Sequence, residues 1–297
     1  MRILVTGSSG FVGKRLVALL KKKGHSVKGF DKAQGNSLLD KKQCLQACKG
    51  MQAVCHLAAV LDENAGNLFE VNVKGTENML EAAAKQRCSQ FIFLSSVGVN
   101  AGCNGTVNEK AAIKPRTAYE KSKAEAEKLV WQSQEMLPVT IVRSALVLGP
   151  NKYWKAIVKQ VGKGFPISGG GKQIWQTIFV DDLVEALGFV LGKEACLGER
   201  FVVAEAEKHS LKELYATIQK ELDINANIRT VPVWLAKIIA LLLRLKGKKS
   251  VVTCAHIDRL ARQRSYDTGK INALGWKAKV GMKEGVKRTV AGLRTKK

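Results

Sequence analysis

A short apolar run near the start of the sequence leads directly into a glycine-rich turn. Residues 2–6 have the sequence RILVT and residues 6–13 the sequence TGSSGFVG, which places glycines at positions 7, 10 and 13. Glycine has no Cβ and adopts positive φ readily, so it permits a tight turn and the close approach of another group. A helix that follows such a turn offers unpaired N–H groups to a phosphate. The sequence therefore predicts a strand–turn–helix unit that binds the pyrophosphate of a dinucleotide.

An acidic residue stands where the second strand is expected to end. Asp31 follows the run 26–30 and lies eighteen residues after Gly13. A carboxylate at this place accepts hydrogen bonds from the ribose hydroxyls of the adenosine and repels a 2′-phosphate. We therefore expect NAD as the cofactor. NADP is the less favoured alternative, because the neighbouring Lys32 could accommodate a phosphate.

Short β-rich apolar runs alternate with helical patterns through the first two thirds of the chain. Strands are predicted at 2–6, 26–30, 53–56, 90–95 and 139–142, and helices at 12–23, 41–48, 68–86 and 117–135. This alternation predicts an α/β Rossmann fold, a doubly wound parallel sheet with helices on both faces. After Arg143 the pattern loosens. We predict a dinucleotide-binding domain over 1–204, with a substrate-loop insertion at about 144–176, and a smaller, mostly helical substrate-binding lobe over 205–297.

A tyrosine and a lysine lie four residues apart in the predicted helix 117–135. Tyr119 and Lys123 therefore share one helical face. To act as a base near pH 7, a tyrosine needs its pKa lowered by about three units, or roughly 4 kcal/mol. One cation at about 4 Å supplies about that much at an effective dielectric constant of about 20. We predict that Tyr119 transfers the proton and that Lys123 lowers its pKa.

A serine completes the predicted catalytic centre. Ser96 follows the predicted strand 90–95, at the edge where open parallel sheets bind ligands. Its hydroxyl can orient the hydroxyl or carbonyl group of a substrate, and Ser95 is the neighbouring alternative. No Gly-x-Ser-x-Gly turn surrounds either serine, so the serine-hydrolase class is not indicated.

Further motifs extend along the chain. Residues 56–59 have the sequence HLAA, residues 72–76 NVKGT and residues 179–182 FVDD, and 266–285 begins with Tyr-Asp and continues through Gly-Trp to Glu-Gly. With the glycine turn and the Tyr-x-x-x-Lys pair, these motifs make nearly the whole chain resemble the extended short-chain dehydrogenase/reductase family, including its NAD-dependent epimerase/dehydratase and 3β-hydroxysteroid dehydrogenase-like branches. The resemblance implies a homodimer through 68–86 and 117–135 and the catalytic residues Ser96, Tyr119 and Lys123. The cofactor contacts that it implies, with Gly13 from the turn, are Gly7, Gly10, Phe11, Val12, Gly13, Asp31, Asn36, Ser37, Leu57, Ala58, Ala59, Tyr119 and Lys123.

Two departures from the family pattern limit which of the family's reactions we expect. Dehydratases of the family carry an acidic pair just after the catalytic hydroxyl residue, whereas residues 97–98 are Val-Gly here, so the dehydratase reaction is not expected. Nucleotide-sugar epimerases place an arginine shortly before the segment 179–182, where it clamps the diphosphate. Trp175 stands at that position, and Arg262 or Arg264 could compensate.

An apolar segment in the C-terminal lobe suggests a third feature of the substrate. Residues 231–244 have the sequence VPVWLAKIIALLLR and are followed by KGKK at 246–249. Three interpretations remain: a lid over an apolar substrate, a helix that rests on an anionic bilayer through 231–249, and an ordinary packed helix. We expect NAD-dependent hydride transfer between nicotinamide and a secondary alcohol or ketone on an apolar, sterol- or isoprenoid-like substrate. A nucleotide-sugar 4-epimerase like UDP-glucose 4-epimerase, with the same catalytic residues, is the alternative. A cofactor-binding scaffold without turnover is less favoured, because it needs no intact catalytic set.

The composition and charge of the chain limit which partners, ligands and cellular location we expect. The chain of 297 residues has a formal net charge of +24, but its lysines are spread and no nucleic-acid-binding motif accompanies them, so no nucleic acid is expected. Seven single cysteines suit a reducing compartment, and no metal ligand set is evident. Since the sequence starts without a signal-peptide pattern and has no run long enough to span a membrane, we expect a cytoplasmic protein.

Overall fold

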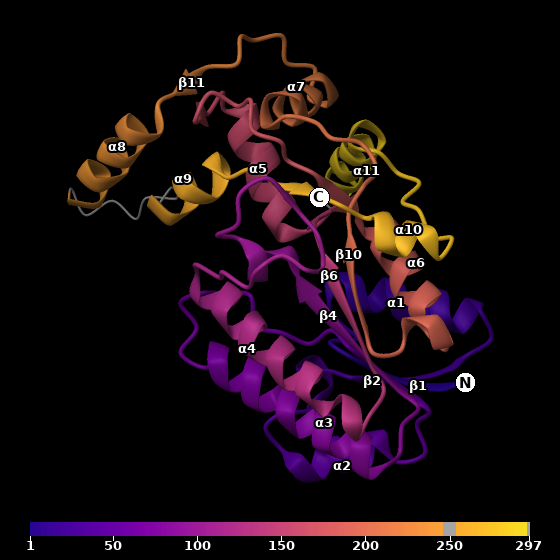
Figure 1. Cartoon of the computed structure of the whole chain (residues 1–297). Coiled ribbons are helices and arrows are strands. Elements are labelled where there is room, and N and C mark those ends of the chain that lie inside the picture. Colours follow the sequence, from indigo (N-terminus) through magenta and orange to yellow (C-terminus); the bar gives the residue numbers. More distant parts are fainter. Residues whose placement is uncertain (246–253, 296–297) are drawn as a thin grey trace.

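A six-stranded, entirely parallel sheet runs through the centre of the molecule (Figure 1). The computed structural model describes residues 1–245 and 254–295; the segment 246–249, which we associated with a membrane contact, lies outside the described residues. The strand order is β10-β6-β4-β3-β1-β2. The bounds are β1 (Arg2–Thr6), β2 (Ser26–Phe30), β3 (Ala53–His56), β4 (Gln90–Ser96), β6 (Val139–Ser144) and β10 (Glu199–Val203). The predicted doubly wound α/β sheet is confirmed.

Helices cover both faces of this sheet (Figure 1). One face carries α1 (Phe11–Lys22) and α6 (Val180–Val190), and the other α2 (Lys41–Cys48), α3 (Gly75–Lys85) and α4 (Ala118–Gln132). The five strands expected from the sequence are all present. The sixth, β10, was missed because its sequence ERFVV begins with two charged residues and follows an irregular segment. Two predicted helices are composite: 68–86 contains a π-helical turn, η2 (Glu70–Lys74), before α3, and 117–135 ends in a 3₁₀ turn, η4 (Ser133–Glu135).

The segment 144–176 and the C-terminal lobe share one hydrophobic core. It is built from α5 (Lys152–Gly162), α7 (Leu211–Glu221) and α11 (Met282–Arg294), together with the strands β7 and β9. Its largest buried side chains are Trp154 and Trp175. Neither segment could bury this surface alone, so the lobe depends on the insertion. The other elements are η1 (Lys32–Gln34), η3 (Val97–Asn100), β5 (Thr106–Val107), β7 (Leu146–Leu148), β8 (Ile167–Ser168), β9 (Thr177–Phe179), η5 (Glu194–Cys196), β11 (Thr230–Val231), α8 (Val233–Leu245), α9 (Cys254–Ala261), β12 (Ser265–Tyr266) and α10 (Gly269–Ala273).

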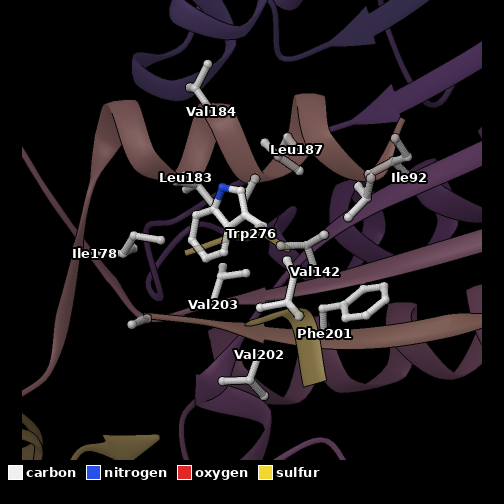
Figure 2. Packing of buried hydrophobic residues seen from close by; sticks show 14 of the residues in the cluster. Ile92, Val142, Ile178, Leu183, Val184, Leu187, Phe201, Val202, Val203 and Trp276 are labelled. Atoms are coloured by element: carbon white, nitrogen blue, oxygen red, sulfur yellow. The ribbon is translucent and has the colours of Figure 1, made fainter. Parts of the chain in front are cut away.

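A tryptophan fastens the C-terminal chain to the main sheet. Figure 2 shows the Trp276 indole between Leu183 and Leu187 of α6 and Val142 and Val203 of the strands. Trp276 is 6% exposed. Burial of an aromatic ring of this size is among the larger favourable contributions that one side chain makes to folding. The Gly-Trp motif of the sequence is thus a packing element, which joins residues after α10 to the hydrophobic core beside the central sheet.

No helix within residues 1–245 or 254–295 combines the length and the apolar character needed to cross a membrane.

Replacing this tryptophan tests how strongly the C-terminal segment is fastened. We expect Trp276→Ala to lower the free energy of unfolding by about 3–5 kcal/mol, because it leaves a large cavity between α6 and the sheet. Trp234→Ala is the matched control, since Trp234 is 64% exposed, and it should change stability by less than about 0.5 kcal/mol. Urea unfolding followed by circular dichroism measures both, and equal effects would contradict the packing role.

Candidate active site

The glycine turn has the geometry that its sequence predicts. Gly7 has φ of 68°, and a Cβ there would lie 2.9 Å from Ala58 N. A Cβ at Gly13 would lie 2.0 Å from Gly7 O, which no side chain could accommodate. Gly10 N donates to Gly7 O at 3.0 Å and α1 starts at the next residue, Phe11. The turn therefore holds the N-terminus of α1, with its unpaired N–H groups, against the ends of β1 and β3.

The acidic residue at the end of β2 lies beside this turn. Asp31 Oδ2 accepts a hydrogen bond from Ser9 N at 3.0 Å, and Oδ1 accepts one from Ala33 N at 2.9 Å. Asn36 Oδ1 accepts from Asp31 N, and Ser37 Oγ accepts from Leu39 N. Asp31 is thereby fixed next to the glycine turn, and Asn36 accepts a hydrogen bond from the Asp31 backbone.

A buried histidine, which we had not counted among the site residues, joins β1 to β3. Thr6 Oγ1 lies 2.9 Å from His56 Nδ1, and His56 Nε2 lies 3.1 Å from Thr76 Oγ1. Complete burial lowers the pKa of His56 to about 3, so the ring is neutral. Since Thr76 Oγ1 donates to Asn72 O at 2.6 Å, it accepts from His56, which fixes the proton on Nε2. Thr6 Oγ1 in turn accepts from Leu57 N and is left to donate to His56 Nδ1.

One asparagine connects the loop after β3 to the helix that carries Tyr119 and Lys123. Asn72 Oδ1 accepts from Val60 N at 2.7 Å, and Asn72 Nδ2 donates to Val60 O and to Ser122 Oγ, each at 3.0 Å. Ser122 Oγ donates to Tyr119 O at 2.8 Å. The loop with Leu57, Ala58 and Ala59 and the predicted catalytic turn of α4 are therefore held in one hydrogen-bonded unit. Asn72 belongs to the sequence motif 72–76, but the motif alone does not show which atoms this residue connects.

The two neighbouring serines of β4 have different roles. Ser95 is buried and donates through Oγ to Glu127 Oε2 at 2.6 Å, and Glu127 forms a buried ion pair with Arg143 at 2.6 Å. Ser96 is half-buried, and its Oγ accepts from Gly98 N at 3.0 Å. A Cβ at Gly98 would lie 3.2 Å from Ser96 Oγ, so this glycine leaves space beside the hydroxyl. Ser95 is thus occupied by Glu127 inside the fold, whereas Ser96 is partly exposed, and its role toward a substrate stays a prediction.

The lysine of the Tyr-x-x-x-Lys pair is buried against a phenylalanine of β4. Lys123 is 3% exposed, and its Nζ lies 3.9 Å from the centroid of the Phe93 ring. Burial lowers the pKa of Lys123 to about 7, although the carboxylate of Glu127 opposes this shift. Tyr119 is half-buried one helical turn earlier. Their helix begins at a capping box in which Thr117 Oγ1 accepts from Glu120 N.

A glutamate next to Tyr119 ties the C-terminal lobe to the start of α4. Glu120 Oε2 accepts from the backbone N–H groups of Arg116 and Thr117, and Glu120 Oε1 lies 3.1 Å from Arg262 Nη1. The glutamate is 7% exposed. This pair was not foreseen, because Glu120 and Arg262 are far apart in the sequence and neither belongs to a motif.

Three arginines gather at this point. The pKa of Arg262 is lowered by burial and further by the positive charges of Arg116 and Arg264, although Glu120 opposes this shift. Arg264 places its guanidinium over the ring of Trp175, 4.5 Å from the centroid. Arg262 Nε is buried and has no hydrogen-bond acceptor among the described residues. Arg116 and Arg264 act electrostatically on Arg262, which pairs with the carboxylate of Glu120, so these four side chains together carry a net positive charge.

The described residues fit NAD. Gly7 and Gly13 cannot carry a Cβ, Asp31 lies at the ribose position of the fingerprint, and Lys123 presents a desolvated ammonium group. NAD would supply a hydride acceptor and donor when bound. Of the predicted site residues, the glycine turn, Asp31 and the segment 57–59 lie in contact with one another, and the helix that carries Tyr119 and Lys123 is joined to that group through Asn72. Their catalytic and binding roles remain predictions.

The desolvated lysine leads to a pH-dependent stability difference. The pKa of Lys123 is about 7 in the folded protein and about 10.4 in an unfolded chain, so between these values the unfolded chain holds the extra proton and stability rises with pH. Without cofactor, Lys123→Met should therefore stabilise the fold more at pH 7 than at pH 10, by on the order of 3 kcal/mol. Urea unfolding at both pH values measures this. Lys121→Met, at an exposed position of the same helix, is the control; a pH-independent difference for Lys123→Met would contradict the burial effect.

Comparison with known proteins agrees with this geometry. The family model described as "NAD dependent epimerase/dehydratase family" matches residues 3–204. The chain is 28% identical to "Uncharacterized UDP-glucose epimerase YtcB" of Bacillus subtilis (strain 168), over 74% of this chain and 81% of that protein. It is 25% identical to "N-acetyl-alpha-D-glucosaminyl-diphospho-ditrans,octacis-undecaprenol 4-epimerase" of Escherichia coli O157:H7, over 97% and 94%.

A solved structure shares the whole fold. UDP-glucose 4-epimerase of Thermotoga maritima, in complex with UDP-glucose, superposes with a TM-score of 0.79 at 22% identity, covering 100% of this chain and 99% of that one. The family match covers more than half of the chain and includes the glycine turn, helix α4 and the sheet. The chain therefore belongs to the NAD-dependent epimerase/dehydratase family of extended short-chain dehydrogenases/reductases, which are enzymes.

Proposed function

We propose that the chain is a 4-epimerase of a sugar carried on a diphosphate, which oxidises and reduces one secondary alcohol carbon with NAD. The observation that carries this proposal is the arginine cluster beside Tyr119. Arg262 Nε is buried without an acceptor among the described residues, and the pKa of Arg262 is lowered by burial and by the neighbouring guanidinium groups. A diphosphate offers the acceptor oxygens and the negative charge that would relieve both costs.

The arginine cluster offers a substitute for the arginine that nucleotide-sugar epimerases place shortly before the segment 179–182. Trp175 replaces the arginine of nucleotide-sugar epimerases, but the guanidinium of Arg264 lies over its ring. A cation is therefore supplied at this place from another part of the chain. Trp175 is 1% exposed, so its ring supports Arg264 and does not line an open cleft.

The chemistry at the alcohol carbon follows from three side chains. Ser96 Oγ, held by Gly98 N, would orient the substrate hydroxyl. The Tyr119 phenolate would accept the proton of that hydroxyl, and the phenol would return it in the reverse step. The Lys123 ammonium stabilises the phenolate form, and the desolvation of Lys123 strengthens this electrostatic effect. A single side chain serves both directions, as a reversible epimerisation requires.

Two further observations support epimerisation within the family. The position after Ser96 is occupied by Val97 and Gly98, so no acidic side chain is present there for the elimination step of a dehydratase. Among the relatives, a UDP-glucose 4-epimerase of Vibrio cholerae is 28% identical over 97% of this chain and 94% of that protein. We also retain the expected homodimer and cytoplasmic location as predictions.

A second candidate is a dehydrogenase of an apolar alcohol or ketone, as the sequence first suggested. Trp175 favours it, because an apolar residue stands where a sugar enzyme carries a charged one. Such an enzyme must exchange its cofactor in every turnover, whereas an epimerase regenerates it within the cycle. Exhaustive dialysis followed by measurement of bound NAD separates the two: retained NAD supports the epimerase, and exchange supports the dehydrogenase.

The catalytic role of Tyr119 can be tested by removing one oxygen atom. We expect Tyr119→Phe to lower kcat by on the order of 10²- to 10⁴-fold while leaving the fold intact, because the proton acceptor is lost and the ring is kept. Tyr153→Phe, at an exposed tyrosine on α5, is the control. Interconversion of UDP-glucose and UDP-galactose with purified protein is the first assay. Unchanged turnover in Tyr119→Phe would overturn the proposed mechanism.

The diphosphate role of Arg262 is tested by binding. Arg262→Met should weaken the affinity for UDP at least tenfold, about 1.4 kcal/mol, in titration calorimetry. Glu120→Gln removes the ion pair but keeps the arginine, so it should retain or improve UDP binding. If both variants lose affinity equally, Arg262 only fastens the C-terminal lobe and the proposal loses its main support.

A further inference from the structure

Helix α8 exposes its large apolar side chains, whereas a surface helix of a globular protein usually buries them. Trp234, Ile238, Leu241 and Leu242 follow the i, i+4, i+7, i+8 pattern of one helical face. They are 64%, 47%, 53% and 53% exposed. Five of the thirteen exposed large apolar side chains found among the described residues lie on this helix, with Ile239 at its flank. The apolar stripe therefore points outward.

The opposite face of α8 contacts the protein through small and paired groups. Ala240 is 7% exposed, and Lys237 Nζ forms an ion pair with Asp258 Oδ1 of α9 at 2.7 Å. Ile257 of α9 is 1% exposed. Lys237, the only charge between residues 233 and 242, is thus paired with an acidic side chain of α9. An exposed apolar face without charges is the reverse of a solvated surface helix.

We propose that α8 docks on the surface of an anionic lipid bilayer and buries this stripe at the boundary between headgroups and acyl chains. Trp234 supplies the aromatic group that favours this boundary, and the aliphatic residues supply the buried area. The protein carries a net charge of +24, and from Lys237 onward the sequence has seventeen Lys and Arg residues against three acids. Anionic lipids complement this charge.

The charge also argues against a second copy of the chain as the occupant. Two molecules that each carry a formal charge of +24 repel, and the α8 stripe offers no acidic partner to offset that repulsion. We propose docking on the bilayer and not a crossing of it, because α8 has 13 residues in the described part of the chain and a spanning helix needs about 20. In Figure 1, α8 and α9 lie at the edge of the molecule, away from α10 and α11, where a flat surface can reach them.

Docking would bring the arginine cluster close to the lipid surface. Helix α9 packs against α8 and ends at Ala261, and the next residue is Arg262, which pairs with Glu120. Two neighbouring helices therefore connect the membrane face to the candidate active site. The docking itself does not depend on the proposed function, because it can be measured without NAD or substrate.

The test is flotation with vesicles of phosphatidylcholine alone or mixed with phosphatidylglycerol, in the absence of cofactor. We expect binding to the mixed vesicles, weaker binding to neutral ones, and loss of binding as salt is raised. Ile238→Asp/Leu241→Asp should reduce the partition coefficient at least tenfold. Met136→Asp is the control, because Met136 is 74% exposed but lies after α4, far along the chain from α8.

A spectroscopic readout and the contrary outcomes complete the test. Fluorescence of Trp234 should shift to the blue with anionic vesicles, and Trp234→Phe should abolish the shift. Absence of binding to either vesicle, or equal binding of Ile238→Asp/Leu241→Asp and the parent protein, would overturn the proposal. A concentration-dependent dimer in sedimentation that these two substitutions dissolve, without vesicle binding, would identify a second copy of the chain as the occupant. Retention of Tyr119-dependent turnover in any of these cases would leave the proposed function intact.

Discussion

The hydrogen bonds that begin at Thr6 and end at Tyr119 set the geometry on which the rest of the site depends. They run through the neutral ring of His56, through Thr76 and Asn72, and into α4 at Ser122. Asn72 Nδ2 donates one hydrogen to Val60 O and the other to Ser122 Oγ, and burial keeps His56 from gaining a second proton. Because the direction of every bond is fixed by its neighbour, the network allows one arrangement of the turn, the loop after β3 and the catalytic helix.

The burial of Lys123 destabilises the fold, and the same burial favours the catalytic role that we predict for this side chain. Lys123 lies under α4 beside Phe93 and near His56, which is neutral, so little stabilises its charge apart from Glu127. Glu127 is itself held by Arg143 and by Ser95. A lysine with full solvation would keep its proton more firmly and would interact more weakly with a neighbouring phenolate. The destabilising burial of Lys123 and its predicted catalytic role therefore have the same physical origin.

The sequence was sufficient for those parts of the fold that are set by local patterns. Strand ends at Thr6, Phe30 and His56 and the glycine turn follow from apolar runs and from positions that exclude a side chain. β10 was missed because its burial comes from pairing with β6 and not from its own composition. Glu120 and Arg262 could not be paired in advance, since 142 residues separate them and only tertiary folding brings them together. The choice between Ser95 and Ser96 likewise needed the position of Glu127.

For the apolar segment 231–244, the sequence pattern alone does not predict which way the apolar face points. Its periodicity is the same whether the stripe faces a core, a substrate or a membrane, because periodicity defines a face but not its direction. The direction is set by α9, which contacts α8 and whose Asp258 pairs with Lys237, while Ala240 of α8 and Ile257 of α9 are both buried. Once that side of the helix is occupied, the large residues have no other protein surface among the described residues to cover them. The composition of α8 is therefore ordinary, and its apolar stripe faces outward because of the way in which α8 packs against α9.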